Sequence, residues 1–352
     1  MSRISRRNFI KGVAAAGVAA GSFGFPAVLR KAHAAPTVLK FGNYNPPQSF
    51  LGAQVFGPWV ERVNKAGEGV LKIDLFLGGQ LGPDPSQQLK MVTDGLADIG
   101  SSGLAFAAGR FPDSTVTNVP FVANTMLEAT IAVNRMHEKN PFNGWSDILP
   151  LSLNTQPQAL LHTLTPIRLP RDLAGVKIRT TGRMQQEMIS AAGGTPVAES
   201  ITRVAENLSR NVFQGTVGEW QGMETFRIVD VARNHTYAPM GTNIFPIFMN
   251  RRSFDRMPAA AQDILMQHSG LNFSIIYAKT WDAHNDGIEQ RLRADPAHTH
   301  IDLSEEAAAI WKATLEAAVQ GWTGTNASFP ALLDRYKEEV ANARRYIAEQ
   351  GL

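Results

Sequence analysis

Strand-like and helix-like hydrophobic patterns alternate along the chain from Thr37 onward. The segment "TVLKFG" (37–42) alternates apolar and polar residues as a half-buried strand does, and 50–66 repeats apolar residues at a helical spacing. The same order continues with a strand at 70–79, a helix at 84–95 and a strand at 95–103. This β-α-β-α-β succession predicts an α/β fold, with a parallel or mixed sheet covered by helices on both faces.

A second, smaller α/β unit follows at about 158–240. A helix at 126–139 precedes it, and the apolar runs 149–164 and 174–182 read as strands. A buried strand, "NIFPIFMN" (243–250), then returns to the first sheet, because the second unit is complete without it. Two crossings between the units predict a hinge, and ligands of α/β sheets bind beyond the carboxyl ends of the strands.

The chain after residue 270 is mainly helical. One long helix is expected at 272–293, Ser304 caps a helix that reaches Trp322, and Pro330 opens the final helix. This last helix carries an apolar stripe at helical spacing, formed by Leu332, Leu333, Tyr336, Val340, Ala343 and Ile347. The stripe predicts packing on the body of a monomer; the alternative is a partner-binding face that joins two copies as a homodimer.

The N-terminus has the three parts of an export signal. Arg6 and Arg7 are followed by an uncharged, moderately apolar run at 13–29 and by an "AHA" site at 32–34. The apolar run is too short and too rich in Gly and Ala to span a bilayer, so 1–34 is expected to be a removable signal. Its paired arginines resemble a twin-arginine (Tat) signal, which predicts a periplasmic protein. The alternative, a basic amphipathic first helix, lacks an apolar stripe.

Removing this segment reverses the net charge of the chain. It holds six basic residues and no acid, so 28 basic and 31 acidic residues remain, a net charge of −3. Without a basic stripe the chain has no electrostatic footprint for nucleic acid. The sequence also has no cysteine, which excludes disulfides, thiolate metal sites and iron–sulfur clusters. The 318 residues that follow fit two domains of ordinary size.

The usual signatures of catalysis are missing. There is no dinucleotide-binding or phosphate-binding glycine motif, no nucleophile elbow and no H-E-x-x-H. The pair "GSSG" (100–103) reads as a turn. Of the eight histidines only His298 and His300 stand close together, a spacing that would suit two metal ligands but is also common by chance on a short strand. We therefore predict no catalytic residue, no cofactor and no metal.

Several motifs stand in the order of a known family. They are "DGLADIG" (94–100), "VPFV" (119–122), "GVKIRTTG" (175–182), "GGTPV" (193–197) and "ENLSRNVFQGTVGEW" (206–220). Together they resemble the periplasmic substrate-binding proteins of tripartite ATP-independent (TRAP) transporters, the DctP-like family. The resemblance runs from about Thr37 to beyond residue 320.

The resemblance implies a two-lobed periplasmic-binding-protein-like fold, with a hinge, a cleft and a long helix that crosses both lobes. Lobe I would comprise 36–157 and 241–285, and lobe II would comprise 158–240 and 286–352 with the C-terminal helices. The cleft would close on a small organic carboxylate, and the closed form would deliver it to the membrane subunits of a TRAP permease. The protein would then not be an enzyme.

Arg179 is the ligand residue that the resemblance supports best. It occupies the arginine position of the family's "G-[LV]-K-[IL]-R" strand, which pairs with the substrate carboxylate. The planar guanidinium fork matches both carboxylate oxygens, and such a charged pair contributes roughly 1.5–3 kcal/mol. The alternative is an arginine that faces solvent from the polar side of the strand.

Other ligand residues are expected around Arg179. Gln158 matches a polar ligand position 21 residues earlier, where other family members carry a second arginine. Trp220 and Glu219 lie in "GTVGEW", with Glu219 open between a ligand residue and a solvent-facing loop, and Gly218 stands where many members have asparagine. Strand-end loops add Asn45, Phe106, Asn243 and Phe245, whose aromatic rings could equally belong to the core.

One arginine beside several aromatic rings suits a monocarboxylate with an apolar or aromatic body, such as a 2-oxo or 2-hydroxy acid. A Tat-exported periplasmic enzyme acting on a small carboxylate and a ligand sensor for a signalling partner are the alternatives. Turnover by the purified protein would favour the first, and the absence of permease genes beside its gene would favour the second.

Overall fold

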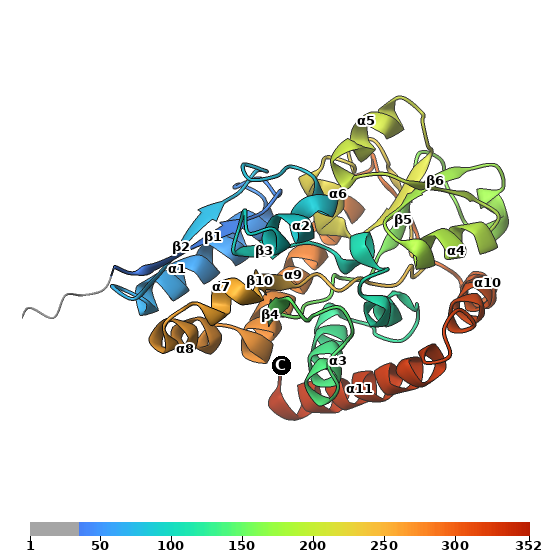
Figure 1. The fold of residues 1–352 in the computed structure, drawn as a ribbon. Helices are drawn as coiled ribbons and strands as arrows, with labels where there is room; N and C mark the ends of the chain where they lie inside the picture. The colour runs from blue at the N-terminus through green and yellow to red at the C-terminus, as the bar shows by residue number, and fades with distance from the viewer. Residues whose placement is uncertain (1–34) are drawn as a thin grey trace, which may run out of the picture. The chain divides into compact units, whose positions relative to one another are not determined.

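Two separate β-sheets organise residues 35–352, the part of the chain that the computed structural model describes (Figure 1). The predicted export signal at 1–34 lies outside the described residues. The first sheet has the strand order β2 (Leu71–Phe76), β1 (Thr37–Gly42), β3 (Ile99–Ser101), β10 (Ile247–Asn250) and β4 (Ile148–Ser152). The second has the order β11 (Thr299–Ile301), β9 (Asn234–Thr236), β5 (Leu160–Thr163), β8 (Gly215–Gly218), β6 (Lys177–Thr180) and β7 (Thr195–Ala198).

The first sheet is mixed, as the alternation of its segments predicts. Strand β1 is parallel to β2 and β3, whereas β10 is antiparallel to its neighbours β3 and β4. The predicted return of the strand within 243–250 to the first sheet is confirmed by β10. All four residues of β10 are buried, because helices cover both faces of this part of the sheet.

The apolar run at 149–164 forms two strands rather than one. Its first part is β4 of the first sheet and its last part is β5 of the second, so the run contains a crossing between lobes. Pro157, which has no N–H to donate to a sheet, lies between the two strands. A hydrophobic run alone does not show that its two ends belong to different sheets.

The outward and the returning crossing run antiparallel and are hydrogen-bonded to each other. Gln156 N donates to Asn243 O at 2.8 Å and Ala159 N donates to Gly241 O at 3.0 Å. Thr155 and Ile244 form an isolated antiparallel bridge in the same ribbon. The predicted pair of crossings is therefore a two-stranded connection between the lobes.

Helices surround both sheets. In the first lobe these are a π-helical turn η2 (Leu51–Phe56) that runs into α1 (Gly57–Ala66), then η3 (Pro85–Gln87), α2 (Gln88–Thr93), η4 (Leu104–Ala107), η5 (Pro112–Asn118), α3 (Met126–Lys139), α7 (Arg251–Asp255) and α8 (Ala259–Gln267). In the second they are η6 (Pro170–Leu173), α4 (Arg183–Ala191), η7 (Ile201–Arg203), α5 (Val204–Ser209) and α6 (Trp220–Thr225). The long helix α9 (Gly270–Arg293) packs on α3 and β4 of the first lobe and on α6 of the second, so it crosses both.

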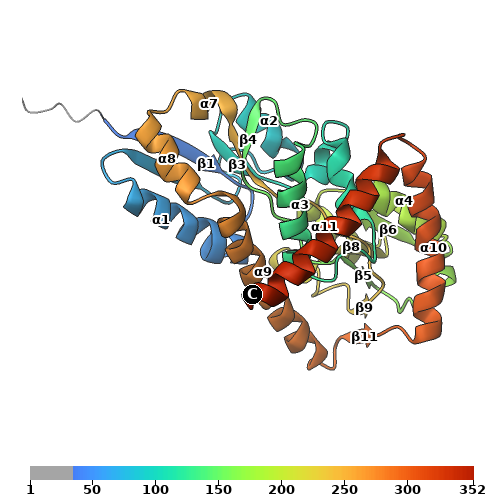
Figure 2. The same cartoon turned by 90° about the horizontal axis from the view of Figure 1, so that it is seen from below.

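The two C-terminal helices pack on different lobes. Helix α10 (Glu305–Thr323) begins after Ser304, whose hydroxyl accepts from Ala307 N as an N-cap, and it packs on α4. Helix α11 (Phe329–Gln350) lies along α3 of the first lobe (Figure 2). The predicted lobe II range 286–352 therefore includes a helix that joins lobe II to lobe I. The apolar stripe of α11 is buried in this contact at five of its six positions: Leu332, Leu333, Tyr336, Val340 and Ala343.

Candidate functional site

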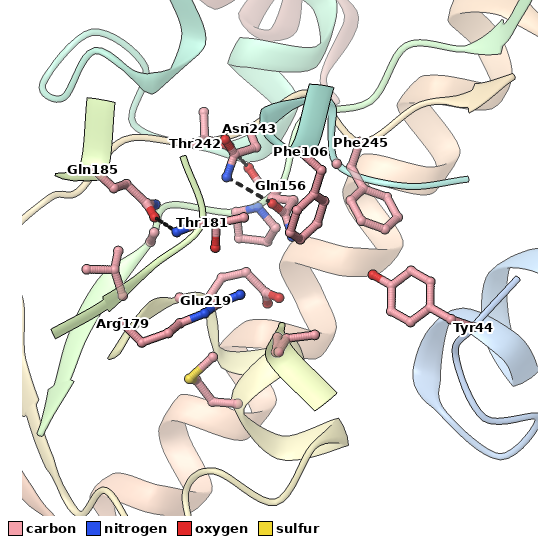
Figure 3. Close-up of a pocket in the computed structure, with 17 residues that line it drawn as sticks. Tyr44, Phe106, Gln156, Arg179, Thr181, Gln185, Glu219, Thr242, Asn243 and Phe245 are labelled. Atoms are coloured by element: carbon pink, nitrogen blue, oxygen red, sulfur yellow. Dashed lines mark hydrogen bonds between the residues drawn. The ribbon is translucent and has the colours of Figure 1, made fainter. Parts of the chain in front are cut away.

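A cavity lies where the two crossing segments meet β6, β8 and the strand-end loops of the first lobe (Figure 3). It contains about 530 Å³ free of protein atoms, counting its opening to solvent. Ten of its 17 lining residues are labelled in Figure 3: Tyr44, Phe106, Gln156, Arg179, Thr181, Gln185, Glu219, Thr242, Asn243 and Phe245.

Arg179 lines this cavity from strand β6 and is only 1% exposed. Its Nε donates to the carbonyl of Glu199 at 2.9 Å, which orients the side chain. Burial lowers its pKa to about 10, so the guanidinium is still charged at neutral pH. No acidic side chain of residues 35–352 forms an ion pair with it within 4.0 Å. A buried charge without an ion-pair partner is costly, so the geometry favours an anion in the cavity.

Glu219 lines the same cavity and is 5% exposed, which excludes the solvent-facing alternative. It is the N-cap of α6: its carboxylate accepts from Gln221 N at 2.7 Å and from Gly222 N at 2.8 Å. Burial raises its pKa to about 7 although these two N–H groups act in the opposite direction. Near neutral pH the side chain is thus divided between a neutral form that can donate a hydrogen bond and a charged form that can only accept.

Aromatic rings form another side of the cavity. Figure 3 shows the rings of Phe106, Phe245 and Tyr44 on the side away from Arg179. Phe245 also packs edge-on against Trp281 with centroids 5.7 Å apart, so this ring belongs both to the cavity and to the core. Burial raises the pKa of the Tyr44 phenol above its ordinary value, which keeps it neutral and able to donate.

Amide and hydroxyl side chains complete the lining. Asn118 Nδ2 donates to Asn243 Oδ1 at 2.7 Å, and Asn243 Nδ2 contacts Gln156 Oε1 at 3.3 Å. Just after β6, Thr181 N donates to Gln185 Oε1 of α4 at 2.9 Å. These bonds fix which polar atoms of Asn243 and Gln156 remain for a ligand.

Three residues predicted at the cleft do not line this cavity. Gln158 lies on the crossing segment and donates to Gly241 O at 2.9 Å, so it joins the two crossings instead. Trp220 is 2% exposed and packs into the core of lobe II, because the first turn of α6 points it away from Glu219. Asn45 donates to Asn43 Oδ1 at 2.8 Å within its loop, and the neighbouring Tyr44 lines the cavity.

Several lining residues had no separate signal in the sequence. Gln156 lines the cavity and Gln158 does not, although they are two residues apart. Residues at this spacing share a face only in a regular strand, and the crossing segment is not a regular strand. Thr181 follows Arg179 by two residues, and this spacing could have predicted that both side chains lie on the same face. Gln185 and Met223 lie on α4 and α6, and local sequence does not show that these helices border the cavity.

Residues 35–352 contain no helix suited to span a membrane and no cluster of side chains placed to hold a metal ion. None of the helices in this range combines the length and apolar character that a bilayer crossing requires. Within the same range no group of three or more His, Asp or Glu side chains is arranged to hold a metal ion.

Comparison with known proteins assigns the chain to a family. The chain matches the model of "Bacterial extracellular solute-binding protein, family 7" (DctP) over residues 41–324. It is 23% identical over 321 residues to the "Outer membrane transporter protein TsaT" of Comamonas testosteroni, a match that covers 85% of this chain and 90% of that protein.

Solved structures share the fold. A marine metagenome TRAP solute-binding protein specific for aromatic acid ligands, in complex with 3-hydroxybenzoate, has a TM-score of 0.83 at 24% identity, with 88% of this chain and 99% of that chain covered. A TRAP solute-binding protein of Rhodoferax ferrireducens in complex with copurified benzoate has a TM-score of 0.83 at 22% identity and the same coverage. Since the family model covers most of the chain, this protein belongs to family 7 of the bacterial extracellular solute-binding proteins, the DctP family of TRAP transporter solute-binding proteins.

Proposed function

We propose that this protein captures a small monocarboxylate with an apolar or aromatic body, such as a 2-oxo or 2-hydroxy acid, and delivers it to the membrane subunits of a TRAP permease. The observation that carries the proposal is the buried guanidinium of Arg179, which lines a cavity and forms no ion pair within 4.0 Å with an acidic side chain of residues 35–352. A ligand carboxylate would satisfy its free N–H groups in a bidentate pair.

The number of charges in the cavity supports one carboxylate rather than two. Arg179 is the only Lys or Arg among the 17 lining residues. A second ligand carboxylate would lie near Glu219, whose own carboxyl is already half charged at neutral pH. The amides of Gln156 and Asn243 suit a hydroxyl or oxo group near the carboxylate, because neutral amides donate and accept without adding charge.

The aromatic side of the cavity supports an apolar body. Rings at Phe106 and Phe245 offer area for stacking or edge contacts with a ligand ring or branched chain. Two proteins of the same fold hold 3-hydroxybenzoate and benzoate, which are monocarboxylates with a ring. These ligands are therefore the first probes to use.

Calorimetry of the purified protein tests the ligand class. We expect 1:1 binding of 3-hydroxybenzoate, of mandelate or of a branched 2-oxo acid, and no binding of succinate or glucuronate at the same concentration. Arg179→Ala should lose roughly 1.5–3 kcal/mol, about 10- to 150-fold in Kd. Arg183→Ala is the matched control, because that arginine is on the adjacent helix, exposed and paired with Glu187. Binding of dicarboxylates or sugar acids alone would contradict the proposal. Turnover of a bound acid would show that the protein is an enzyme instead.

We further propose that the chain reaches the periplasm through its N-terminal 34 residues by the Tat route. The paired Arg6 and Arg7 and the family's extracellular location support this route. Replacing both arginines by lysine should leave the protein in the cytoplasmic fraction. Unchanged export of that variant would contradict the Tat route and leave the ligand proposal untouched.

A further inference from the structure

Four histidines of lobe II lie together outside the cavity. His162 on β5 is the register partner of His235 on β9, and His235 is the register partner of His300 on β11. Partners on neighbouring strands project from the same face of a sheet, and His298 precedes His300 by two residues. The sequence shows only that His298 and His300 are close together, whereas the sheet register brings His162 and His235 beside them.

Three of these rings form a continuous chain of contacts. His298 Nδ1 lies 2.9 Å from His235 Nε2, and His235 Nδ1 lies 2.8 Å from His162 Nδ1. His162 Nε2 lies 3.1 Å from the carbonyl oxygen of Gly218, at the end of β8. Two nitrogens on one zinc ion would lie about 3.3 Å apart and would both be bare, so these shorter separations indicate hydrogen bonds.

The carbonyl of Gly218 determines the position of every proton in the chain. A carbonyl only accepts, so His162 must carry its proton on Nε2 and leave Nδ1 bare. The bond between the two Nδ1 atoms then requires the proton on His235, and the bare Nε2 of His235 requires a proton on His298 Nδ1. The neutral chain thus has one proton order, in which each ring donates toward Gly218.

Burial keeps the inner part of this chain neutral. His162 and His235 are 1% and 0% exposed and pack edge-on against Trp220, with centroids 4.8 and 4.7 Å away. This desolvation lowers the pKa of His162 to about 4 and that of His235 to about 2. At neutral pH the donor of His162 therefore points at Gly218 without a charge beside the cavity.

We propose that His162 is a positioning residue for the ligand site, held in its donor orientation by His235 and His298. It fixes the end of β8, where Gly218 lines the cavity and Glu219 follows as the N-cap of α6. Loss of this bond frees the turn that places the Glu219 carboxyl at the cavity. The effect on ligand affinity rests on the proposed function; the effect on Glu219 does not.

Nitrogen NMR of the histidine rings tests the chain in the ligand-free protein. We expect the Nε2–H tautomer for His162 and the less common Nδ1–H tautomer for both His235 and His298. Assignment of His235 as Nε2–H would break the chain and overturn the proposal.

Two substitutions test the positioning role. In His162→Gln the amide offers a donor and an acceptor about as far apart as the two ring nitrogens, whereas His162→Leu offers neither. We expect the carboxyl carbon of Glu219 to titrate in His162→Gln as in the unmodified protein and to shift its midpoint in His162→Leu. We also expect His162→Leu to weaken 3-hydroxybenzoate about tenfold and His162→Gln to stay within about threefold.

The outcomes separate this proposal from the ligand class. If the unmodified protein does not bind 3-hydroxybenzoate, the result counts against the proposed ligand class. The titration of Glu219 needs no ligand, so it still tests the role of His162. An unchanged Glu219 midpoint in His162→Leu overturns the positioning role. If His162→Leu does not fold, His162→Phe keeps a ring but offers Gly218 no donor, and it takes the place of His162→Leu in the same titration, with the same overturning result.

Discussion

The side chain of Met223 packs directly over Gly218: a Cβ atom built on Gly218 would lie 2.3 Å from Met223 Cε. Both residues line the cavity. The family resemblance would place an asparagine at position 218, whereas here the flexible thioether of Met223 fills the space beside Gly218. Thioethers adapt to irregular apolar surfaces, which agrees with a ligand that has an apolar body.

A side chain at position 218 should therefore disturb the cavity. In Gly218→Ala the methyl group must displace the flexible end of the Met223 side chain, which then moves within the cavity. We expect this shift to cost about 1 kcal/mol of binding free energy, roughly fivefold in the Kd of 3-hydroxybenzoate. The double variant Gly218→Ala, Met223→Ala should recover part of the affinity because the clash is gone. Calorimetry checks both; equal affinity of Gly218→Ala and the unmodified protein would show that Met223 moves away freely.

Ligand affinity should depend on pH through Glu219. Its pKa of about 7 means that the carboxyl is mostly neutral at pH 6 and mostly charged at pH 8. The charged form repels a ligand carboxylate in the same cavity, so affinity should fall as pH rises through 7, by at most about tenfold per pH unit. Arg179 and the ligand acid keep their charges over this range. Glu219→Gln should bind equally at pH 6 and pH 8, and a pH dependence that survives this change must come from another group.

The two glutamines of the crossing segment should behave differently. Gln156 lines the cavity, whereas Gln158 bonds to the carbonyl of Gly241 in the opposite crossing. Gln156→Ala should weaken 3-hydroxybenzoate by about 0.5–1.5 kcal/mol, the value of one neutral hydrogen bond. Gln158→Ala should change the free energy of unfolding more than it changes the free energy of ligand binding. The reverse result, measured by calorimetry and urea unfolding, would return Gln158 to the site.

Helix α11 should stabilise the fold rather than join two copies. Tyr336 is fully buried between α11 and the body of the protein. Tyr336→Ala should lower the unfolding free energy by about 3–5 kcal/mol, as for other large aromatic truncations in a core. Lys337→Ala on the exposed side of the same helix is the control. A loss of dimer with little loss of stability, seen by light scattering and urea unfolding, would instead support the dimer alternative.

Acid should destabilise the protein through its buried histidines. The pKa values of His162 and His235 are lowered in the folded state, so both groups bind protons mainly after unfolding. Their contribution to stability is complete above the unfolded pKa of about 6.5 and is lost as pH falls toward 4, at up to about 1.4 kcal/mol per pH unit for each.

The groups around this pair are His298 and His300, with Asp295, Arg233 and Asp230 near the first and Arg293, Glu289 and Asp302 near the second. Glu219 acts in the opposite direction, since its raised pKa favours the folded state as pH falls through 7. Urea unfolding is therefore best measured in Glu219→Gln. In that background His235→Phe should reduce the slope between pH 6 and pH 4.5, and an equal slope would show that other groups carry it.

The family and the order of the elements could be predicted from the sequence alone. Periodicity showed the alternating strands and helices, and the cap at Ser304 and the start near Pro330 were readable because caps act within one turn. Motif order gave the resemblance that the family model confirms over residues 41–324. Arg179 could be singled out because its motif is a short continuous run, residues 175–179.

Which side chains meet depends on the tertiary fold. Glu219 and Trp220 are neighbours in the chain, but the start of α6 turns the first toward the cavity and the second into the core. Gln158 and Asn45 do not line this cavity, and the sequence could not show this because crossing segments and loops have no regular period from which a side-chain direction can be read. His162 and His235 are 73 residues apart and meet only through strand register, which local sequence does not encode. Chemistry confined to one element can be read along the chain, whereas contacts between elements depend on how the two sheets assemble.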